Sequence, residues 1–207
     1  MIFIDSLKKQ KMRHCSSYHV LLLFGFSFFL PAQGSDPWNQ FRGPNGSGIR
    51  ADASIGVPSV DDLLWKTPLP FGLSCPVLSE DKIFLTGMEN KSLLTIALER
   101  ESGKVLWKKK APKTEIEKFH PSSSPVTPTP FVEEKRLYIY FGSYGLICYD
   151  HQGLEIWKKP LPTPRSLYGT ASSPLVHENL LIQVIDDDAN MPNSQVSRSR
   201  ILALDKE

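Results

Sequence analysis

The chain has 207 residues, enough for one domain of ordinary size. Its 24 Lys and Arg residues against 22 Asp and Glu residues leave a formal net charge of +2, which gives no support for binding to nucleic acid or to an anionic membrane surface. Apolar residues make up 41% of the sequence, as in a globular protein, while 17 prolines and 13 glycines argue against long uninterrupted helices.

The N-terminus has the pattern of a secretory signal peptide. A basic start precedes the apolar run VLLLFGFSFFL at residues 20–30, which is shorter than the roughly 20 residues that a bilayer span needs. The small residues Ala32 and Gly34 fit cleavage after Gly34. We therefore expect residues 1–34 to be a signal and the mature protein to be periplasmic or extracellular, without a transmembrane span. A buried helix and an uncleaved anchor are the alternatives.

Residues 35–62 form a lead-in segment ahead of the first repeat. The stretch FRGPNGSG, at residues 41–48, is rich in glycine but lacks the Gly-Lys-Ser/Thr ending of a phosphate-binding loop. We expect a structural loop there. The segment LLWKTPLP, at residues 63–70, follows and predicts a strand around Trp65.

A hairpin motif then occurs three times. The copies are ALERESGKVLW at residues 97–107, CYDHQGLEIW at residues 148–157 and ALDKE at residues 203–207. In the first two copies a glycine, Gly103 or Gly153, stands four residues before a tryptophan, Trp107 or Trp157. A glycine in this place adopts the positive φ that returns the second strand to the ladder. The motif therefore predicts β-hairpins.

A second motif precedes each hairpin. The copies are CPVLSEDKIFLTG at residues 75–87, TPFVEEKRLYIYFG at residues 129–142 and SPLVHENLLIQVID at residues 173–186. Each reads as Pro, two apolar residues, a polar turn and an apolar strand, so a whole unit holds about four short strands. Such sheets bury their faces only by stacking on neighbouring copies. Residues 63–207 therefore predict an all-β fold, a β-propeller of four-stranded antiparallel blades.

The hairpin motif resembles the ALDxxTGxxxW repeat of the PQQ-like β-propellers, and WNQFRGPNGSG at residues 38–48 resembles the opening of exported bacterial members of that family. The propeller lipoprotein of the outer-membrane β-barrel assembly machine is similar too. The resemblance implies seven or eight blades, so we expect this chain to be an N-terminal fragment, with assembly on a second subunit as the alternative. It also implies that Trp107, Trp157 and, by analogy, Trp65 wedge between blades as structural positions, the last in the outer strand of the final blade.

The resemblance is compatible with two functions. One is a non-catalytic exported scaffold that binds other envelope proteins or a ligand. The other is a PQQ-dependent alcohol or sugar dehydrogenase, which the family implies would carry PQQ, calcium, a catalytic Asp and a pair of adjacent cysteines. After the signal the only cysteines are Cys75 and Cys148, which are 73 positions apart (148 − 75). We therefore favour the scaffold, expect neither PQQ nor calcium, and assign no catalytic residue.

Three histidines and an acidic cluster are the candidate site residues of the sequence. The cluster DDDAN, at residues 186–190, starts like a calcium loop, but Met191 replaces the glycine of the sharp turn, so we expect a solvated loop. His120, His151 and His177 stand apart without a GxSxG elbow, so we expect loop histidines.

The two basic runs, WKKKAPK at residues 107–113 and WKKP at residues 157–160, lack the interleaved aromatic residues that stack on nucleic-acid bases. Because both follow a tryptophan, we expect solvated connections between blades. The two remaining cysteines have apolar surroundings in sequence. A disulfide between them is one reading, and two buried free thiols are the expected one.

Overall fold

A computed structural model of the protein describes residues 38–49, 56–187 and 198–207. The expected signal at residues 1–34 and most of the acidic segment at residues 186–190 lie outside these ranges. Within them, helical structure is limited to two short 3-10 helices, η1 (Pro44–Gly46) and η2 (Val60–Asp62). No helix among the described residues is long and apolar enough to cross a membrane.

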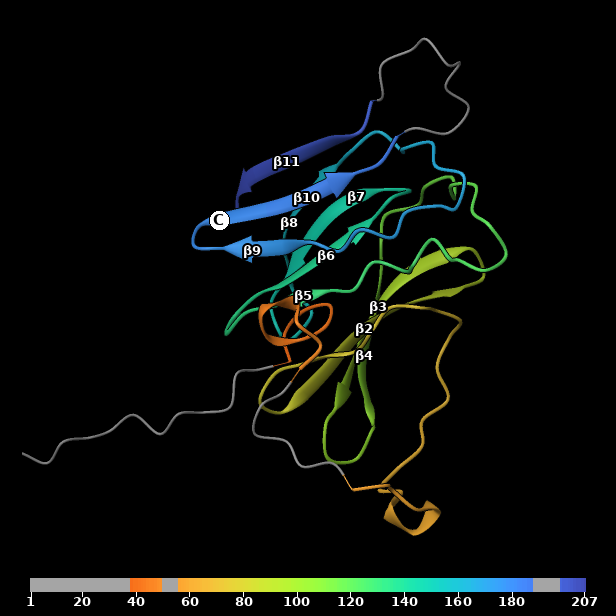
Figure 1. Cartoon of the computed structure of the whole chain (residues 1–207), viewed down its shortest axis with the longest axis vertical. Coiled ribbons are helices and arrows are strands. Elements are labelled where there is room, and N and C mark those ends of the chain that lie inside the picture. The colour runs from red at the N-terminus through yellow and green to blue at the C-terminus, as the bar shows by residue number, and fades with distance from the viewer. Residues whose placement is uncertain (1–37, 50–55, 188–197) are drawn as a thin grey trace, which may run out of the picture. The chain divides into compact units, whose positions relative to one another are not determined.

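The strands form three antiparallel sheets, which follow one another along the chain and are called blades 1, 2 and 3 (Figure 1). Blade 1 holds β1 (Val77–Leu78), β2 (Lys82–Glu89), β3 (Ser92–Glu99) and β4 (Val105–Lys110); blade 2 holds β5 (Phe131–Val132), β6 (Leu137–Phe141), β7 (Gly145–Tyr149) and β8 (Glu155–Pro160); blade 3 holds β9 (Leu175–His177), β10 (Leu180–Ile185) and β11 (Arg200–Asp205). Neighbouring strands pair in chain order within each sheet. The expected all-β fold with four-stranded blades is confirmed, and the described blades form part of a propeller.

The blades stack face to face, and the middle strands of blade 2, which lies between the other two, are covered on both sides. Phe84 and Ala97 of blade 1 share one buried cluster with Ile139 and Ile147 of blade 2. A second cluster joins blade 2 to blade 3, and every residue of β7 is buried. Burial of both faces explains why these middle strands are nearly continuous apolar runs in sequence. Along the outer strand β4, by contrast, half-buried and exposed residues alternate.

The two complete hairpins have the same local geometry. Gly103 and Gly153 adopt positive φ, 68° and 81°. In each hairpin the register shifts at the same place, directly after the small residue that pairs with the tryptophan. These pairs are Ala97 with Trp107 and Cys148 with Trp157. A small side chain opposite each indole leaves room for the ring on that face of the sheet.

Three tryptophans each contact the hairpin of the blade that follows them in the chain, and we call these contacts the outer seam. The indole nitrogens of Trp65, Trp107 and Trp157 donate hydrogen bonds to the carbonyl oxygens of Arg100 (3.1 Å), His151 (3.1 Å) and Lys206 (3.2 Å), respectively. Each acceptor directly follows the acidic residue of the motif. A Cβ atom added at Gly153 would lie 3.0 Å from the Trp107 ring, and one added at Gly103 would collide with Trp65. The glycine therefore provides the surface on which the ring lies.

A second set of contacts links the blades beside their first strands, and we call it the inner seam. The backbone N–H of Cys75 donates to the Thr129 hydroxyl at 3.0 Å, and the N–H of Thr129 donates to the Ser173 hydroxyl at 2.9 Å. All three residues directly precede the proline of the upstream motif. One repeated position thus connects successive blades.

Two expectations differ from the structure. The basic residues 108–110 lie in β4, and Lys158 and Lys159 lie in β8, so the prediction of connecting loops is wrong there. Lysines on an outer strand have a physical reason, because charge on a sheet edge discourages pairing with another chain. Residues 63–70 are described and form no strand, so the strand expected around Trp65 is not observed.

Candidate functional site

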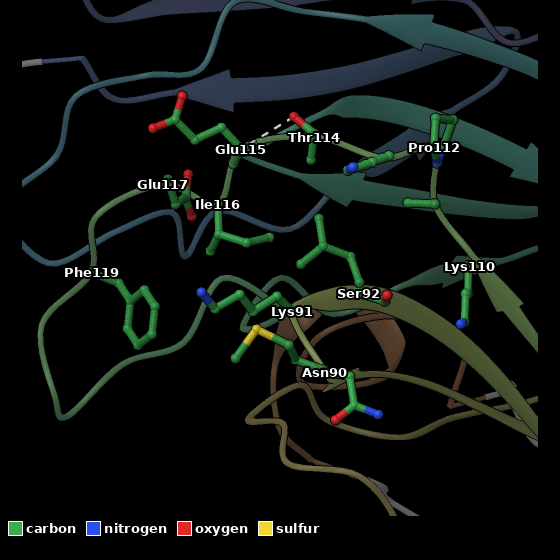
Figure 2. A pocket seen from close by; sticks show the side chains of 14 residues that line it. Asn90, Lys91, Ser92, Lys110, Pro112, Thr114, Glu115, Ile116, Glu117 and Phe119 are labelled. Atoms are coloured by element: carbon green, nitrogen blue, oxygen red, sulfur yellow. Dashed lines mark hydrogen bonds between the residues drawn. The ribbon is translucent and has the colours of Figure 1, made fainter.

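A hollow lies at one end of blade 1, between the β2–β3 turn and the segment that leaves β4 (Figure 2). Its volume is about 990 Å³. We call it the blade-end hollow. It is lined by residues 88, 90–93, 110–117 and 119. Most of these residues belong to connections and not to the repeated hairpin motif, so this surface is specific to one blade.

The floor of the hollow is apolar. Met88, Ala111 and Ile116 are half-buried and pack against the core between blades 1 and 2. Leu93 is buried, and Phe119 is half-buried in the segment after Ile116. An apolar floor of this kind gains free energy when a ligand removes it from water, and a methionine adapts to different shapes.

The rim of the hollow carries lysines. Lys91, Lys110 and Lys113 are exposed, and among the described residues none of them forms an ion pair. In Figure 2 the Lys91 side chain projects from the turn toward the segment that carries Ile116, while the carboxylate of Glu115 points away from it. The rim therefore presents positive charge that the neighbouring carboxylates do not neutralise directly.

Hydrogen bonds fix the segment that forms one wall. The N–H of Ala111 donates to the Leu93 carbonyl oxygen at 2.9 Å. Three residues on, the Thr114 hydroxyl donates to the Ser143 carbonyl oxygen at 2.6 Å, and the N–H of Glu117 donates to the Ser143 hydroxyl at 3.0 Å. The wall is thus held to blade 1 and to the β6–β7 turn of blade 2, which makes the hollow pre-formed.

Glu117 is a buried carboxyl group at the end of this wall, with 7% of its surface exposed. It accepts hydrogen bonds from the N–H (3.2 Å) and the hydroxyl (2.9 Å) of Thr170. Burial raises its pKa above the ordinary value, and the hydrogen bonds from Thr170 oppose this rise in part. A side chain at Gly142 would collide with both residues, which explains the glycine there. Glu117 therefore joins the wall of the hollow to the segment between blades 2 and 3.

The histidines and tryptophans singled out in the sequence do not line this hollow, whereas the basic run at residues 107–113 contributes Lys110 and Lys113 to its rim. His151 contacts the Glu133 carbonyl oxygen through Nε2 (2.8 Å), and His120 contacts the Ser122 hydroxyl through Nδ1 (2.7 Å). Within the described ranges there is no cluster of three or more His, Cys, Asp or Glu side chains suited to a metal.

Both cysteines of the described chain are free thiols in different blades. Cys148 is buried in blade 2, and burial raises its pKa to about 12, so it remains a protonated thiol at neutral pH. Cys75 is only half-buried, which differs from the expected buried thiol. Neither is adjacent to another cysteine.

Sequence reasoning did not find the residues of the hollow. Glu117 gave no signal because its partner Thr170 is 53 residues away. The one usable signal was the basic run at residues 107–113, which includes the rim residues Lys110 and Lys113.

One family comparison identifies the class of protein. The sequence model of the family described as outer membrane protein assembly factor BamB matches residues 51–206. The chain therefore belongs to this family of PQQ-like β-propeller repeat proteins.

Among solved structures, the quinohemoprotein alcohol dehydrogenase ADHIIG from Pseudomonas putida HK5 is similar at 18% identity, with a TM-score of 0.49, over 70% of this chain and 21% of that one. This chain thus spans about a fifth of the length of that protein. None of the curated proteins compared with the chain matches it.

Proposed function

We propose that the protein is an exported, non-catalytic scaffold of the cell envelope, and that the blade-end hollow binds a partner protein. The observation that carries this proposal is the hollow itself, which combines an apolar floor, a lysine rim and a hydrogen-bonded wall. Apolar surface surrounded by polar residues, on a pre-formed support, is the usual make-up of a protein-binding site. The family's description as an assembly factor supports a protein as the partner, and the signal-like N-terminus supports export.

The two cysteines support the scaffold over the PQQ-dependent alternative. That chemistry, as the family resemblance implies it, requires adjacent cysteines, whereas Cys75 and Cys148 stand in different blades and Cys148 is enclosed by the core between blades 2 and 3. We accordingly propose that the protein works without PQQ or calcium.

A reconstitution experiment tests the absence of quinone chemistry. The purified protein is incubated with PQQ and calcium, passed through gel filtration and examined by absorbance, and then assayed for dye reduction with alcohols and sugars. The scaffold function predicts no quinone band and no dye reduction. A stoichiometric quinone band with dye reduction would contradict it.

Site-specific photo-crosslinking tests the binding surface. A benzophenone amino acid replaces Glu115, which is exposed at the hollow, or Gln152, which is exposed in the β7–β8 turn as a control. In living cells, position 115 is expected to capture a defined envelope protein that position 152 does not capture. Capture of the same protein from both positions, or from neither, would contradict binding at the hollow.

A further inference from the structure

We propose that the occupant of the blade-end hollow is an acidic segment of the partner protein, with an apolar side chain on the floor and flanking carboxylates on Lys91, Lys110 and Lys113. This inference rests on the proposed function, because it names the chemistry of the partner at the same surface. It is carried by three features of the hollow: the backbone of Lys91, the balance of charge on the rim and the shape of the floor.

Lys91 occupies a backbone conformation that does not suit a lysine. Asn90 and Lys91 form the two-residue β2–β3 turn with φ of 50° and 57°. Glycine is the favoured residue at the second position of such a turn, because a side chain with positive φ costs roughly 1 kcal/mol. A lysine at this place gives up stability and puts an ammonium group on the rim. A strained residue beside a hollow points to a role in binding.

The rim of the hollow carries more positive than negative charge. The three rim lysines have no ion-pair partner among the described residues. Glu117, the buried carboxyl of the wall, accepts hydrogen bonds from the N–H and the hydroxyl of Thr170. The lining thus holds three exposed lysines and one exposed carboxylate, that of Glu115, which points away from Lys91 in Figure 2. A segment with carboxylates meets a net positive charge, which favours its association and its orientation.

The floor selects for an apolar side chain between these charges. Met88, Ala111 and Ile116 form a half-buried surface that already packs on the core, so it stays in place when a ligand binds. The wall beside it is held by Thr114 and Ser143, so little ordering cost remains to be met on binding. The pattern that fits is one or two apolar residues flanked by Asp or Glu.

A protein segment fits this shape better than the other anionic partners. A bilayer surface is flat, whereas the lysines surround a hollow of about 990 Å³ that admits several side chains. Single-stranded nucleic acid stacks on rows of aromatic rings, and Phe119 is the one aromatic residue among those that line the hollow. An acidic, apolar peptide uses both the charge and the concavity.

The test uses a fluorescein-labelled peptide, Asp-Glu-Leu-Phe-Glu-Asp, titrated with the whole protein and followed by fluorescence anisotropy. Two comparison peptides carry Asn and Gln in place of the acids, or Ala in place of Leu-Phe. The acidic, apolar peptide is expected to bind with a Kd on the order of 100 µM and to lose several-fold in affinity between about 50 and 500 mM salt. Equal binding of the amide peptide or the alanine peptide would overturn the proposal.

Variants locate the binding on the protein. Lys91→Glu combined with Lys113→Glu is expected to weaken binding at least about tenfold at low salt, because two attractive charges become repulsive. Lys104→Glu changes an exposed lysine of the β3–β4 turn and is expected to change binding less than about twofold. If the double variant does not fold, Lys113→Gln alone provides the same comparison with a smaller loss. Unchanged binding in the Lys113 and Lys91 variants would contradict the proposal.

Failure of this inference is distinct from failure of the proposed function. Capture of a partner from position 115, without binding of the acidic peptide, leaves the scaffold function in place and removes the acidic segment. Binding to phosphatidylglycerol vesicles that needs Lys91 and Lys113, without binding of the peptide, also overturns the acidic segment. A stoichiometric quinone band removes the scaffold function itself.

Discussion

The seams between blades and the blade-end hollow are two regions of the same sheets with opposite character. The seams use repeated positions: a glycine under a tryptophan on the outer side, and a hydroxyl before a proline on the inner side. Most residues of the hollow lie outside the two repeated motifs, such as Lys91 in its strained turn. The contrast indicates that repetition stabilises the stack of blades, whereas a single unrepeated segment provides specificity.

The largest expected loss of stability follows from removal of a seam tryptophan. Trp107 packs against Phe84 (centroids 5.9 Å apart) and Tyr149 (6.2 Å) and donates to the His151 carbonyl oxygen. Trp107→Ala is expected to lower the free energy of unfolding by about 3 kcal/mol, measured by urea denaturation. Trp107→Phe keeps an aromatic ring and loses the N–H donor, so it should cost about 1 kcal/mol. Equal losses in the two variants would mean that the ring does not stabilise the seam.

Gly153→Ala tests the surface on which that ring lies. The backbone of Gly153 has φ of 81°, and an added Cβ would lie 2.8 Å from Cε of the flexible Lys109 side chain and 3.0 Å from the Trp107 ring. We expect a loss of about 2 kcal/mol, from backbone strain and displacement of the ring together. Gly46→Ala is the matched control, because Gly46 has φ of 62° with nothing near its Cβ position. It should show the strain alone, about 1 kcal/mol. The contribution of the ring is refuted by an equal loss in both variants.

The inner seam is expected to contribute less. Ser173→Ala removes the hydroxyl that accepts the N–H of Thr129, a buried residue, and so leaves that donor without this partner. A loss of about 1 kcal/mol is expected by thermal denaturation. Ser122→Ala removes an exposed hydroxyl and should have almost no effect. A Ser173 variant as stable as the Ser122 variant would show that the inner seam is not a stabilising contact.

Glu117, in the wall of the hollow, is expected to make the free energy of unfolding depend on pH. Because its pKa is raised in the folded protein, the folded chain holds the proton to higher pH than the unfolded chain does. Its contribution to stability therefore falls as the pH rises from about 4.5, the ordinary glutamate value, through the raised folded value. Glu117→Gln keeps groups able to pair with Thr170 and has no charge.

We accordingly expect the unfolding free energy of the Gln variant, relative to wild type, to increase with pH across this window, as measured by urea denaturation at several pH values. A constant difference, or a change of opposite sign, would show that burial does not raise the pKa of Glu117.

The smallest expected effect is a gain of stability, in contrast to the losses above. Lys91→Gly relieves the positive φ of the turn and should raise the free energy of unfolding by up to about 1 kcal/mol. The same change removes a rim charge and should weaken binding of the acidic peptide several-fold. A variant that gains stability without losing affinity would show that Lys91 is not part of the binding surface.

The sequence was informative where positions repeat. The spacing of Gly103 and Trp107, and its recurrence at Gly153 and Trp157, was enough to predict the hairpins, the blades and the family. The prediction was wrong where a strand continues past the motif. Residues 108–110 follow the motif tryptophan and were expected to form a solvated connection, but they complete β4. Charge on an outer strand and charge on a loop look alike in sequence, because both face water.

The hollow was beyond prediction for a different reason. Glu117 and Thr170 meet only because the blades stack, and no local pattern encodes a contact 53 residues apart. Lys91 resembles any surface lysine until its φ is known. A site formed by unrepeated connections therefore needs the fold, whereas the fold itself can be predicted from the repeats.

Amide hydrogen exchange, measured with and without the acidic peptide, tests the central claim most directly. The claim is that the blade-end hollow binds the peptide, whereas the seams stabilise the stack of blades and do not contact it. The peptide is expected to slow exchange at residues 90–93 and 111–119 and to leave the turns at residues 100–104 and 150–154 unchanged. Protection at those two turns, with none at residues 90–93 and 111–119, would contradict the assignment of binding to the blade-end hollow.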